Sequence, residues 1–333
     1  MTARELALGA RSVATPGRVL VLAAVIFLLA WPYMGASRFT LHVASLTFIW
    51  AVVASYWNLL SGYSGIFSLG NLGFFAFGAY VSSVAAIELG LSPWISIWIG
   101  AVATGTIVTV FLGLPALRLR GIYIALLTLI FALALPSIIS LLRDWTGGGI
   151  GLLGIPTFIG SIERWQAYYI TLAFAIVALA VLYGIVNGKT GMAFVALRDS
   201  EDFAGAVGVD RYREGLKVFA ITAFVTGMAG GFFAHTLGAI SPAILGVDQF
   251  LMVIAMWLLG GVATFLGPII GAFVITFGNE YLRVAGTLRL GLIGGLIVVT
   301  ILLFPGGIMQ LIDDAKALGA GQWRRWRGRG DVA

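Results

Sequence analysis

Cysteine is absent from this chain of 333 residues, and histidine occurs only twice. Without cysteine the protein forms no disulfide bond and no thiolate metal site, and its redox compartment is left undecided. The sequence also lacks H-E-x-x-H and C-x-x-C, two short motifs that hold metal ions or redox centres. These absences leave little material for metal or thiol chemistry.

Charged residues are scarce as well. They make up 10% of the chain, whereas hydrophobic residues make up 60% and the mean hydropathy is +1.03. A soluble domain carries about 25% charged residues, spread throughout its sequence. Here the charges cluster between long apolar runs, and the 45 glycines suit helices that pack closely in lipid. We therefore predict an all-α, polytopic helical membrane protein.

Nine apolar runs form a single transmembrane domain within residues 1–333. The run 250–278 is broken by Gly260-Gly261 and Gly267-Pro268, which predicts a pair of short helices, and the stretch 62–80 is predicted to be partly re-entrant. We therefore expect about eight to ten crossings, with glycine-rich broken or re-entrant segments. The runs lie near 19–36, 39–60, 74–89, 94–114, 121–142, 166–186, 218–240, 250–278 and 288–304.

Basic residues mark the cytoplasmic side of a membrane protein. Fifteen of the 20 Lys and Arg residues fall in segments 1–18, 118–120, 187–217 and 316–329. Alternation of the spans brings all four segments to one side if both termini are cytoplasmic. We therefore predict a cytoplasmic N-terminus (1–18), a cytoplasmic loop (187–217) and a basic cytoplasmic tail (305–333). The net charge of +6 reflects this orientation rather than binding to nucleic acid.

The chain has no nucleotide-binding motif of its own. The stretch GIVNGKT at 184–190 resembles the end of a P-loop, but the first glycine of that motif would fall at Tyr183. An apolar run of spanning length precedes it, where a P-loop requires a short strand. No Asp or Glu occupies the middle of a span, which argues against a proton-driven pump or an intramembrane protease. We predict that the chain is not an enzyme and binds no cofactor.

Ionisable residues near the ends of spans receive no functional role from the sequence. Glu88 is expected at the outer interface, and the depth of Glu280 is open. His42 and His235 are expected at an interface or in helix contacts, because no carboxylate partner for a proton relay is evident.

The longest polar interruption is the segment 187–217. From Gly191 onward it is predicted to form a short amphipathic helix, in which Phe194, Leu197 and Ala204 follow helical spacing. Two interpretations stay open: a solvated helix that ties two spans together, or a helix that docks into a cleft on a cytosolic partner. Its charged face and the glycines predicted to interrupt it are Arg198, Asp199, Glu201, Asp202, Gly205 and Gly208.

Within this segment, Asp202-Phe203-Ala204-x-x-x-Gly208 resembles a degenerate E-A-A-x-x-x-G loop, in which Asp replaces Glu and Phe replaces the first Ala. Permeases of ATP-binding-cassette (ABC) importers dock on their ATPase through that loop. Over about residues 40–310, five further stretches resemble, in order, the blocks of high-affinity branched-chain amino acid ABC permeases of the longer, basic-tailed type. They are NLLSGYSGIFSLGNLGFFAFGAY (58–80), LRLRGIYIALLTL (117–129), TGGGIGLLGIP (146–156), GGVATFLGPIIGAF (260–273) and LFPGGIM (303–309).

The resemblance implies a permease subunit of the bacterial inner membrane that forms half of a translocation pathway. Its expected partners are a second homologous permease, two cytosolic ATPases that bind the ATP, and an extracytoplasmic solute-binding protein. The solute would be a branched-chain or related amino acid, although members of this group also carry urea, short amides and organic acids. The implied docking residues are Arg198, Asp199, Glu201, Asp202, Ala204 and Gly208. The alternative is a secondary transporter or channel working alone.

Glycines interleave with polar residues between Asn58 and Tyr80. Glycine at membrane depth loosens a helix and frees backbone groups that need partners. Water or a zwitterionic solute would supply such partners, which makes four residues candidates for the translocation path. Close packing of small residues against neighbouring helices explains the pattern equally well. The four candidates are Asn58, Ser64, Ser68 and Asn71.

Overall fold

A computed structural model describes residues 23–119, 121–158, 164–282 and 306–309, together with 291, 294, 295 and 298. Most of these residues are helical, and six of the helices are long and apolar enough to cross a membrane. The predicted class, an all-α polytopic membrane protein, is confirmed. The described elements are η1 (Trp31–Met34), α2 (Arg38–Asn58), η2 (Leu59–Tyr63), α3 (Asn71–Glu88), α4 (Pro93–Val108), η3 (Thr109–Gly113), α5 (Leu114–Ala116), α6 (Ile122–Leu141), α7 (Arg143–Thr146), β1 (Leu152–Leu153), α8 (Arg164–Val186), α9 (Lys189–Asp199), α10 (Glu201–Ala206), α11 (Arg211–Leu237), β2 (Ala239–Ile240), η4 (Pro242–Leu245), α12 (Val247–Gly260) and α13 (Gly267–Tyr281).

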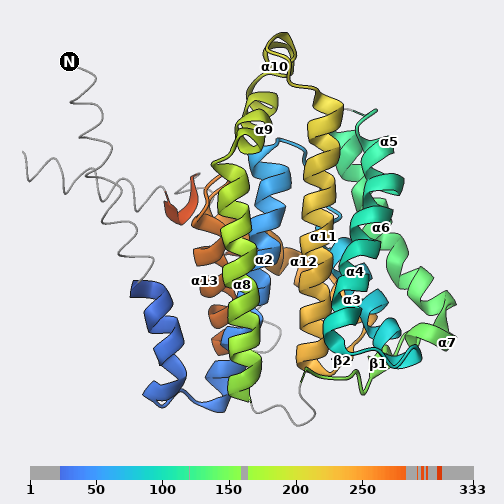
Figure 1. Ribbon diagram of the computed structural model, residues 1–333, viewed down its shortest axis with the longest axis vertical. Coiled ribbons are helices and arrows are strands. Elements are labelled where there is room, and N and C mark those ends of the chain that lie inside the picture. The colour runs from blue at the N-terminus through green and yellow to red at the C-terminus, as the bar shows by residue number, and fades with distance from the viewer. Residues whose placement is uncertain are drawn as a thin grey trace, which may run out of the picture.

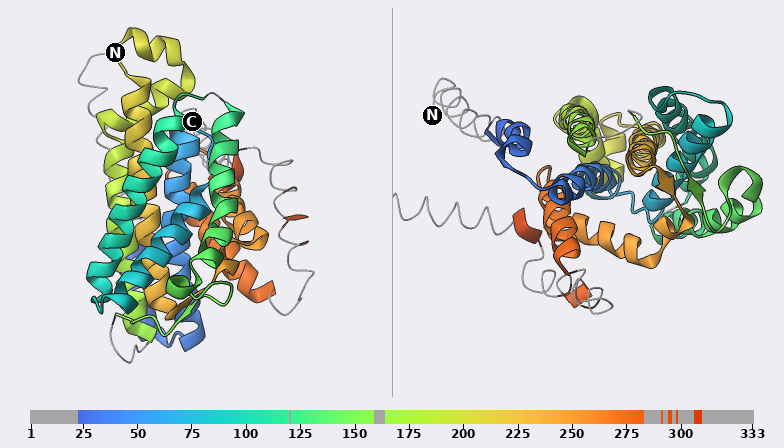
Figure 2. Two further views of the ribbon diagram at one scale, coloured as in Figure 1. Left: turned by 90° about the vertical axis from the view of Figure 1, so that its right-hand side faces the viewer. Right: turned by 90° about the horizontal axis from the view of Figure 1, so that it is seen from below.

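Helix α2 forms the centre of the bundle (Figure 1; Figure 2, right). The most apolar window of the span Arg38–Tyr63 is 94% buried, against 33% for Ile122–Leu141 and for Trp165–Val186. That difference separates an inner helix, wrapped by protein, from outer helices whose large apolar side chains face the bilayer. Helices α8, α11, α12 and α13 all contact α2. Burial of α2 therefore organises the rest of the fold.

Glycine sets the spacing where α11 packs against α3 and α4. A Cβ atom at Gly230 would overlap the carbonyl oxygen of Phe75, and one at Gly78 would overlap the backbone of Gly227. In α4, a Cβ atom at Gly100 would lie 2.6 Å from the carbonyl oxygen of Gly78. Only residues without a side chain permit this approach, which is the small-residue packing expected of membrane helices.

The loops gather at two opposite ends of the bundle (Figure 1). One end, called the α9 end below, carries α5, α9 and α10. The other end, called the strand end, carries α7 and the short antiparallel pair of β1 and β2, in which Leu152 is opposite Ile240. Each of the six long helices runs from one of these ends towards the other.

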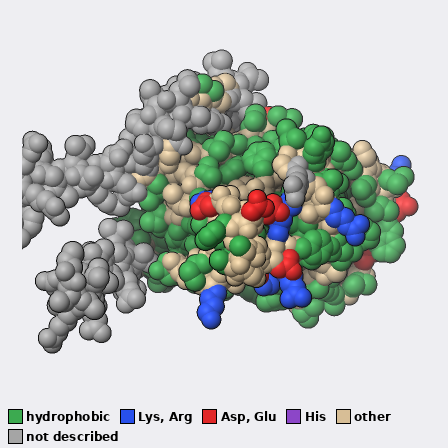
Figure 3. All heavy atoms as spheres, turned by 90° about the horizontal axis from the view of Figure 1, so that it is seen from above, with side chains coloured by type: hydrophobic (Ala, Val, Ile, Leu, Met, Phe, Trp, Pro, Cys, Tyr) green, Lys and Arg blue, Asp and Glu red, His purple; other side chains and the backbone are tan. Residues whose placement is uncertain are grey.

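Two of the basic loops predicted to share one side do so in the structure. The guanidinium of Arg211 in the 187–217 segment donates a hydrogen bond to the carbonyl oxygen of Leu119 (3.2 Å), so that segment adjoins the 118–120 loop. Viewed onto this end, Lys and Arg side chains gather together with Asp and Glu side chains (Figure 3). The predicted segment 1–18 and nearly all of the tail 305–333 lie outside the described residues.

The break predicted in 250–278 is confirmed, and the partly re-entrant form predicted for 62–80 stays a prediction. The run 250–278 divides into α12 and α13, which are joined by a turn at 261–266. In the stretch 62–80, α2 continues as the π-helical turn η2 to Tyr63, residues 64–70 are non-helical, and α3 begins at Asn71. The predicted run 288–304 lies mostly outside the described residues, so the total of eight to ten crossings stays a prediction.

The predicted amphipathic helix of the 187–217 segment is two helices. Helix α9 begins at Lys189, before Gly191, and ends where Ser200 takes an extended conformation (φ −162°). The Ser200 hydroxyl then accepts a hydrogen bond from the backbone N–H of Phe203 (3.3 Å), which caps the start of α10. Gly205 lies inside α10 and does not interrupt it, so that part of the prediction was wrong.

Candidate functional site

Three segments that are distant in the sequence meet near the α9 end. They are residues 58–65, the α12–α13 turn at 261–266, and residues 306–309, and we call their meeting place the glycine junction. A Cβ atom at Gly62 would lie 2.8 Å from the backbone nitrogen of Ala263, and one at Gly307 would lie 2.7 Å from that of Gly261. The fold thus joins three of the sequence blocks that carry the family resemblance.

Asn58 binds the α12–α13 turn through both polar atoms of its amide. Its Nδ2 donates to the carbonyl oxygen of Thr264 (2.8 Å). Its Oδ1 accepts from the indole Nε1 of Trp257 (2.9 Å) and from the backbone N–H of Ala263 (2.8 Å). Since Asn58 is only 1% exposed, any of these groups left unpaired would carry an uncompensated desolvation penalty. Asn58 therefore fixes the turn to the end of α2.

The turn that Asn58 binds has a strained backbone. Ala263 has a φ of 57° and is the single residue other than glycine with positive φ in the part of the chain that the structure describes. A left-handed conformation costs a residue with a side chain on the order of 1–3 kcal/mol, and it persists only where the surroundings hold it. The hydrogen bond from Ala263 to Asn58 is one contact that holds it.

The non-helical loop 64–70 satisfies much of its backbone within the protein. The indole Nε1 of Trp57 donates to the carbonyl oxygen of Ser68 (2.8 Å), and the N–H of Leu69 donates to the hydroxyl of Thr128 in α6 (3.0 Å). The hydroxyl of Ser64 donates to a carbonyl one turn earlier (2.6 Å). Internal bonding of this kind is the condition on which irregular backbone is tolerated at membrane depth.

The four candidate path residues are all buried, with exposed fractions of 6% or less. Asn58 bonds to the α12–α13 turn, whereas the hydroxyl of Ser64 donates to the carbonyl oxygen of Leu60 and that of Ser68 accepts from the N–H of Gly70. Asn71 differs, because neither its amide oxygen nor its amide nitrogen has a partner among the described residues. An unpaired buried polar group costs about 1–3 kcal/mol. Asn71 therefore has unused hydrogen-bonding capacity, while the assignment of all four residues to a path stays a prediction.

The α9–α10 segment presents an apolar tip beside acidic side chains. Phe203 is 67% exposed and Val207 is 62% exposed, and Glu201 and Asp202 next to them are also exposed. On the inner side, Phe194 is fully buried and attaches α9 to the bundle. The segment therefore holds an exposed apolar tip on a buried anchor.

The predicted docking residues occupy different environments. Arg198 pairs with Asp199 (2.8 Å), and Glu201 pairs with Arg211 at the start of α11 (3.1 Å). Asp202 has no ion-pair partner within the described residues. Two further members of the set shape the backbone. Ala204 is fully buried and its carbonyl oxygen accepts from the N–H of Val209 (2.9 Å), whereas the exposed Gly208 has a φ of 87°.

Arg198 also faces inward, which the sequence did not predict. Its Nη1 donates to the carbonyl oxygen of Gly62 in η2 (3.2 Å). Its side-chain stem covers Gly65, where a Cβ atom would lie 2.8 Å from the Arg198 Cγ. Arg198 therefore links the α9–α10 segment directly to the glycine junction. An arginine on a polar helix is expected to face solvent, so the sequence contained no signal for its contact with Gly62.

The structure places Glu88 and His235 in the kinds of position that the sequence predicts. Glu88 is exposed at the end of α3. His235 is fully buried and is a helix-contact residue, with its ring between Ser82 of α3 and the carbonyl oxygen of Pro156. His42 and Glu280 are half-buried. No group of three or more potential metal ligands occurs in the ranges that the structure describes.

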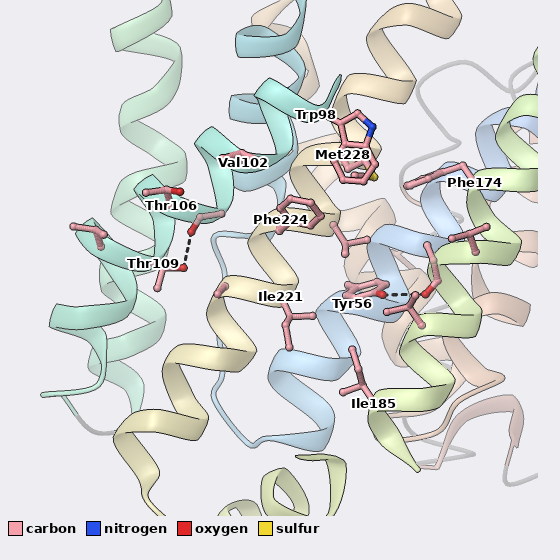
Figure 4. Close-up of a pocket in the computed structure, with 17 residues that line it drawn as sticks. Tyr56, Trp98, Val102, Thr106, Thr109, Phe174, Ile185, Ile221, Phe224 and Met228 are labelled. Atoms are coloured by element: carbon pink, nitrogen blue, oxygen red, sulfur yellow. Dashed lines mark hydrogen bonds between the residues drawn. The ribbon is translucent and has the colours of Figure 1, made fainter. Parts of the chain in front are cut away.

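An apolar groove of about 700 Å³ opens between α4 and α8, with α11 at its base (Figure 4). Trp98 and Val102 line one side, Phe174 and Ile185 line the other, and Phe224 lies between them. Desolvating a zwitterionic solute against such a wall is unfavourable. The groove therefore suits lipid chains or an apolar helix.

Comparison with known proteins places this sequence in a family. The model of the family described as "branched-chain amino acid transport system / permease component" matches residues 39–301. The chain belongs to this permease family. The match includes α2 from its second residue, η2, the α9–α10 segment and the α12–α13 turn, so the glycine junction, apart from residues 306–309, lies within the family's shared region.

Individual permease proteins are similar to the chain over 60% or more of its length. The high-affinity branched-chain amino acid transport system permease protein LivM of Escherichia coli (strain K12) is 29% identical, over 88% of this chain and 75% of LivM. LivM of Salmonella typhimurium is 27% identical, over 92% of this chain and 78% of its own length. The autoinducer 2 import system permease protein LsrC of Salmonella paratyphi B is 27% identical over 60% of this chain. No solved structure matches.

Proposed function

We propose that this chain is the transmembrane permease subunit of an ABC importer in the bacterial inner membrane. It would form half of the pathway for a branched-chain or related amino acid, as the names of its LivM relatives suggest. Its partners would be a second homologous permease, two cytosolic ATPases and an extracytoplasmic solute-binding protein. ATP would bind to the ATPases, so the permease itself would carry neither a cofactor nor an active site.

The observation that carries this proposal is the α9–α10 segment. It gathers exposed Phe203 and Val207 beside the carboxylate of Asp202, at an end of the bundle that is rich in basic residues. Basic loops mark the cytoplasmic side, which is where an ATPase subunit is available. Exposure of two apolar side chains to water is unfavourable, and a docked partner would remove this cost by burying them. The α9 end would therefore face the cytoplasm.

The environment of Asn71 supports a solute path beside the first turn of α3. Its amide is fully buried and has no partner among the described residues, at the end of a loop that enters the bundle from the α9 end. A conformation in which the loop 64–70 moves would open this amide to water or to a zwitterionic solute. Such a state would remove the cost of leaving the amide unpaired.

Co-purification from membranes tests the proposal. The chain is expressed with candidate ATPase, permease and binding-protein subunits, and ATP-dependent leucine uptake is measured in vesicles. Asp202→Lys should remove the ATPase from the purified complex and abolish uptake. The control is Asp144→Lys, because Asp144 is a highly exposed acidic residue at the strand end, and its ATPase content should be unchanged. Leucine uptake by the chain alone, without ATPase or ATP, would instead establish a stand-alone transporter.

A further inference from the structure

We infer that Asn58 is a positioning residue through which helix α9 controls the conformation of the α12–α13 turn. The connection runs from Arg198 through Gly62 to Asn58 and from there to Ala263. This inference rests on the proposed docking of an ATPase at the α9–α10 segment, and it names the route by which that docking would reach the interior of the bundle.

The far end of the route is a turn with a strained backbone. The turn 261–266 holds Ala263 at a φ of 57° and Gly261 at a φ of 119°. Loss of the contact on its N–H would remove one of the restraints that keep Ala263 from an ordinary conformation. Asn58 provides that contact and binds the flanking residues Trp257 and Thr264 with the same amide. The Asn58 amide therefore biases the turn towards the strained state.

The middle of the route has no free space. A Cβ atom at Gly62 would overlap the Oδ1 of Asn58 and would lie 2.8 Å from the nitrogen of Ala263. The backbone of η2 therefore lies directly against the Asn58 side chain and the turn. Because packed groups this close cannot be compressed, a displacement of Gly62 towards the turn must displace Asn58 or Ala263 as well.

The near end of the route is Arg198. It holds η2 at two places, through the hydrogen bond to the Gly62 carbonyl oxygen (3.2 Å) and through the stem that covers Gly65. Helix α9 is in turn joined tightly to the end of α8, since a Cβ atom at Gly191 would overlap the carbonyl oxygen of Val186. A displacement of α9 would therefore reach η2 through the Arg198 side chain.

The segment between these contacts can change its shape. Residues Leu59–Tyr63 form a π-helical turn, in which the N–H of Ser64 donates to the carbonyl oxygen of Leu59 (3.2 Å). Single π-turns within a helical span are less stable than α-helix and commonly mark functional sites. Helix α2 continues directly into η2, so a change in the π-turn would shift Gly62 relative to Asn58.

A cysteine reporter in the turn tests the inference in the assembled importer. Val262 is 44% exposed, and because the chain has no native cysteine, Val262→Cys provides one reactive thiol beside Ala263. Its rate of reaction with a small polar maleimide is measured with and without ATP, and mass spectrometry of this chain separates it from partner cysteines. Leu153→Cys, with residue 153 72% exposed at the strand end, is the control.

We expect ATP to change the reaction rate at Val262→Cys by about tenfold, which corresponds to the loss of one ordinary hydrogen bond, and to leave Leu153→Cys unaffected. Asn58→Leu should make the Val262→Cys rate independent of ATP while the ATPase still co-purifies. Trp257→Phe removes one of the three hydrogen bonds but keeps an aromatic ring, and it should reduce the ATP effect. Arg198→Gln should also reduce it without changing the rate in the absence of ATP at Leu153→Cys.

Two results would overturn the inference. The first is an ATP-dependent rate at Val262→Cys that is the same in the unaltered, Asn58→Leu, Trp257→Phe and Arg198→Gln backgrounds. The second is the absence of any ATP effect in a complex that retains its ATPase and takes up leucine. Failure of the ATPase to co-purify with the otherwise unaltered chain is a different result, because it overturns the proposed function and not this route.

Discussion

His235 of α11 and Ser82 of α3 are joined by a hydrogen bond of 2.9 Å between Nε2 and Oγ. The other ring nitrogen, Nδ1, lies 2.6 Å from the carbonyl oxygen of Pro156, which can only accept, so Nδ1 is the donor there. In the neutral ring Nε2 then accepts the hydroxyl proton of Ser82. One imidazole therefore connects two spans to the loop that contains β1.

Substitution of Ser82 should destabilise the protein more than substitution of its neighbour. Ser82→Ala leaves the fully buried Nε2 of His235 without a donor, at a cost of about 1–3 kcal/mol. Ser83→Ala removes only an intrahelical bond to the carbonyl oxygen of Ala79 and should have little effect. Thermal unfolding in detergent, followed by size-exclusion chromatography, measures both. Equal melting temperatures for the two variants would contradict a structural role for His235.

Gly208 and Gly205 provide a matched pair in the α9–α10 segment. Neither would bring a Cβ atom within 4 Å of a neighbour, but only Gly208 has positive φ, at 87°. Gly208→Ala therefore costs about 1–2 kcal/mol through the backbone alone, and it should loosen the connection to α11 and lower uptake. Gly205→Ala lies inside α10 and should preserve uptake. If the two variants transport equally well, the conformation at Gly208 is not needed for docking.

The contact between α3 and α11 should tolerate no side chain at Gly230. A Cβ atom there would overlap the carbonyl oxygen of Phe75, so Gly230→Ala must separate two spans. We expect a large loss of folded protein in the membrane, of the size seen for overpacked cores, about 1–3 kcal/mol or more. Gly184→Ala in α8 meets no atom within 4 Å and should accumulate normally. Fluorescent fusions quantify the yield of both variants.

Reporter fusions check the orientation. A fusion at Gly188 should report cytoplasm and a fusion at Gly151 should report the outside, because these residues lie at opposite ends of the bundle and the basic loops mark the inner side. A fusion after Lys316 should also report cytoplasm. A cytoplasmic signal at Gly151 would reverse the orientation and place the α9–α10 segment out of reach of a cytosolic ATPase.

The candidate path can be tested with single cysteines in this naturally cysteine-free chain. Substitutions Asn58→Cys, Ser64→Cys, Ser68→Cys and Asn71→Cys should react slowly with polar thiol reagents at rest, because all four positions are buried. ATP should increase the reaction at Asn71→Cys above all. Thr47→Cys, in the buried middle of α2, is the control and should stay unreactive. No reaction at any of the four positions in any transport state would show that this stretch only packs.

The sequence predicted the class of fold because hydropathy reports directly on burial in lipid. The sequence also located the breaks between α12 and α13 and between η2 and α3. Gly260-Gly261, Gly267-Pro268 and the glycines after Asn58 interrupt the apolar runs there. The sequence did not find the junction between these breaks. The partners of Asn58 are two backbone groups and an indole from a distant segment, and backbone groups leave no mark in a sequence.

Arg198 shows a second limit. Its helix has the polar pattern of an exposed element, and the arginine does pair with Asp199 on the surface. Its contact with Gly62 depends on how α9 folds back over the end of α2, which no local periodicity describes. The split of the predicted helix at Ser200 was missed for a related reason, because a serine in a polar helix also suits the interior of that helix until its hydroxyl acts as a cap.

The burial of α2 has a consequence for how the protein is made. This helix leaves the ribosome before α8, α11 and α13, which later enclose it, so it first enters the bilayer with lipid as its neighbour. The hydroxyls of Ser45 and Thr47 have hydrogen-bond partners in lipid as well, since each donates to a carbonyl of its own helix. Asn58 lacks its partner at that stage, because Thr264 is synthesised 206 residues later. The Asn58 amide therefore gains its partners only after α12 and the turn that follows it have been made.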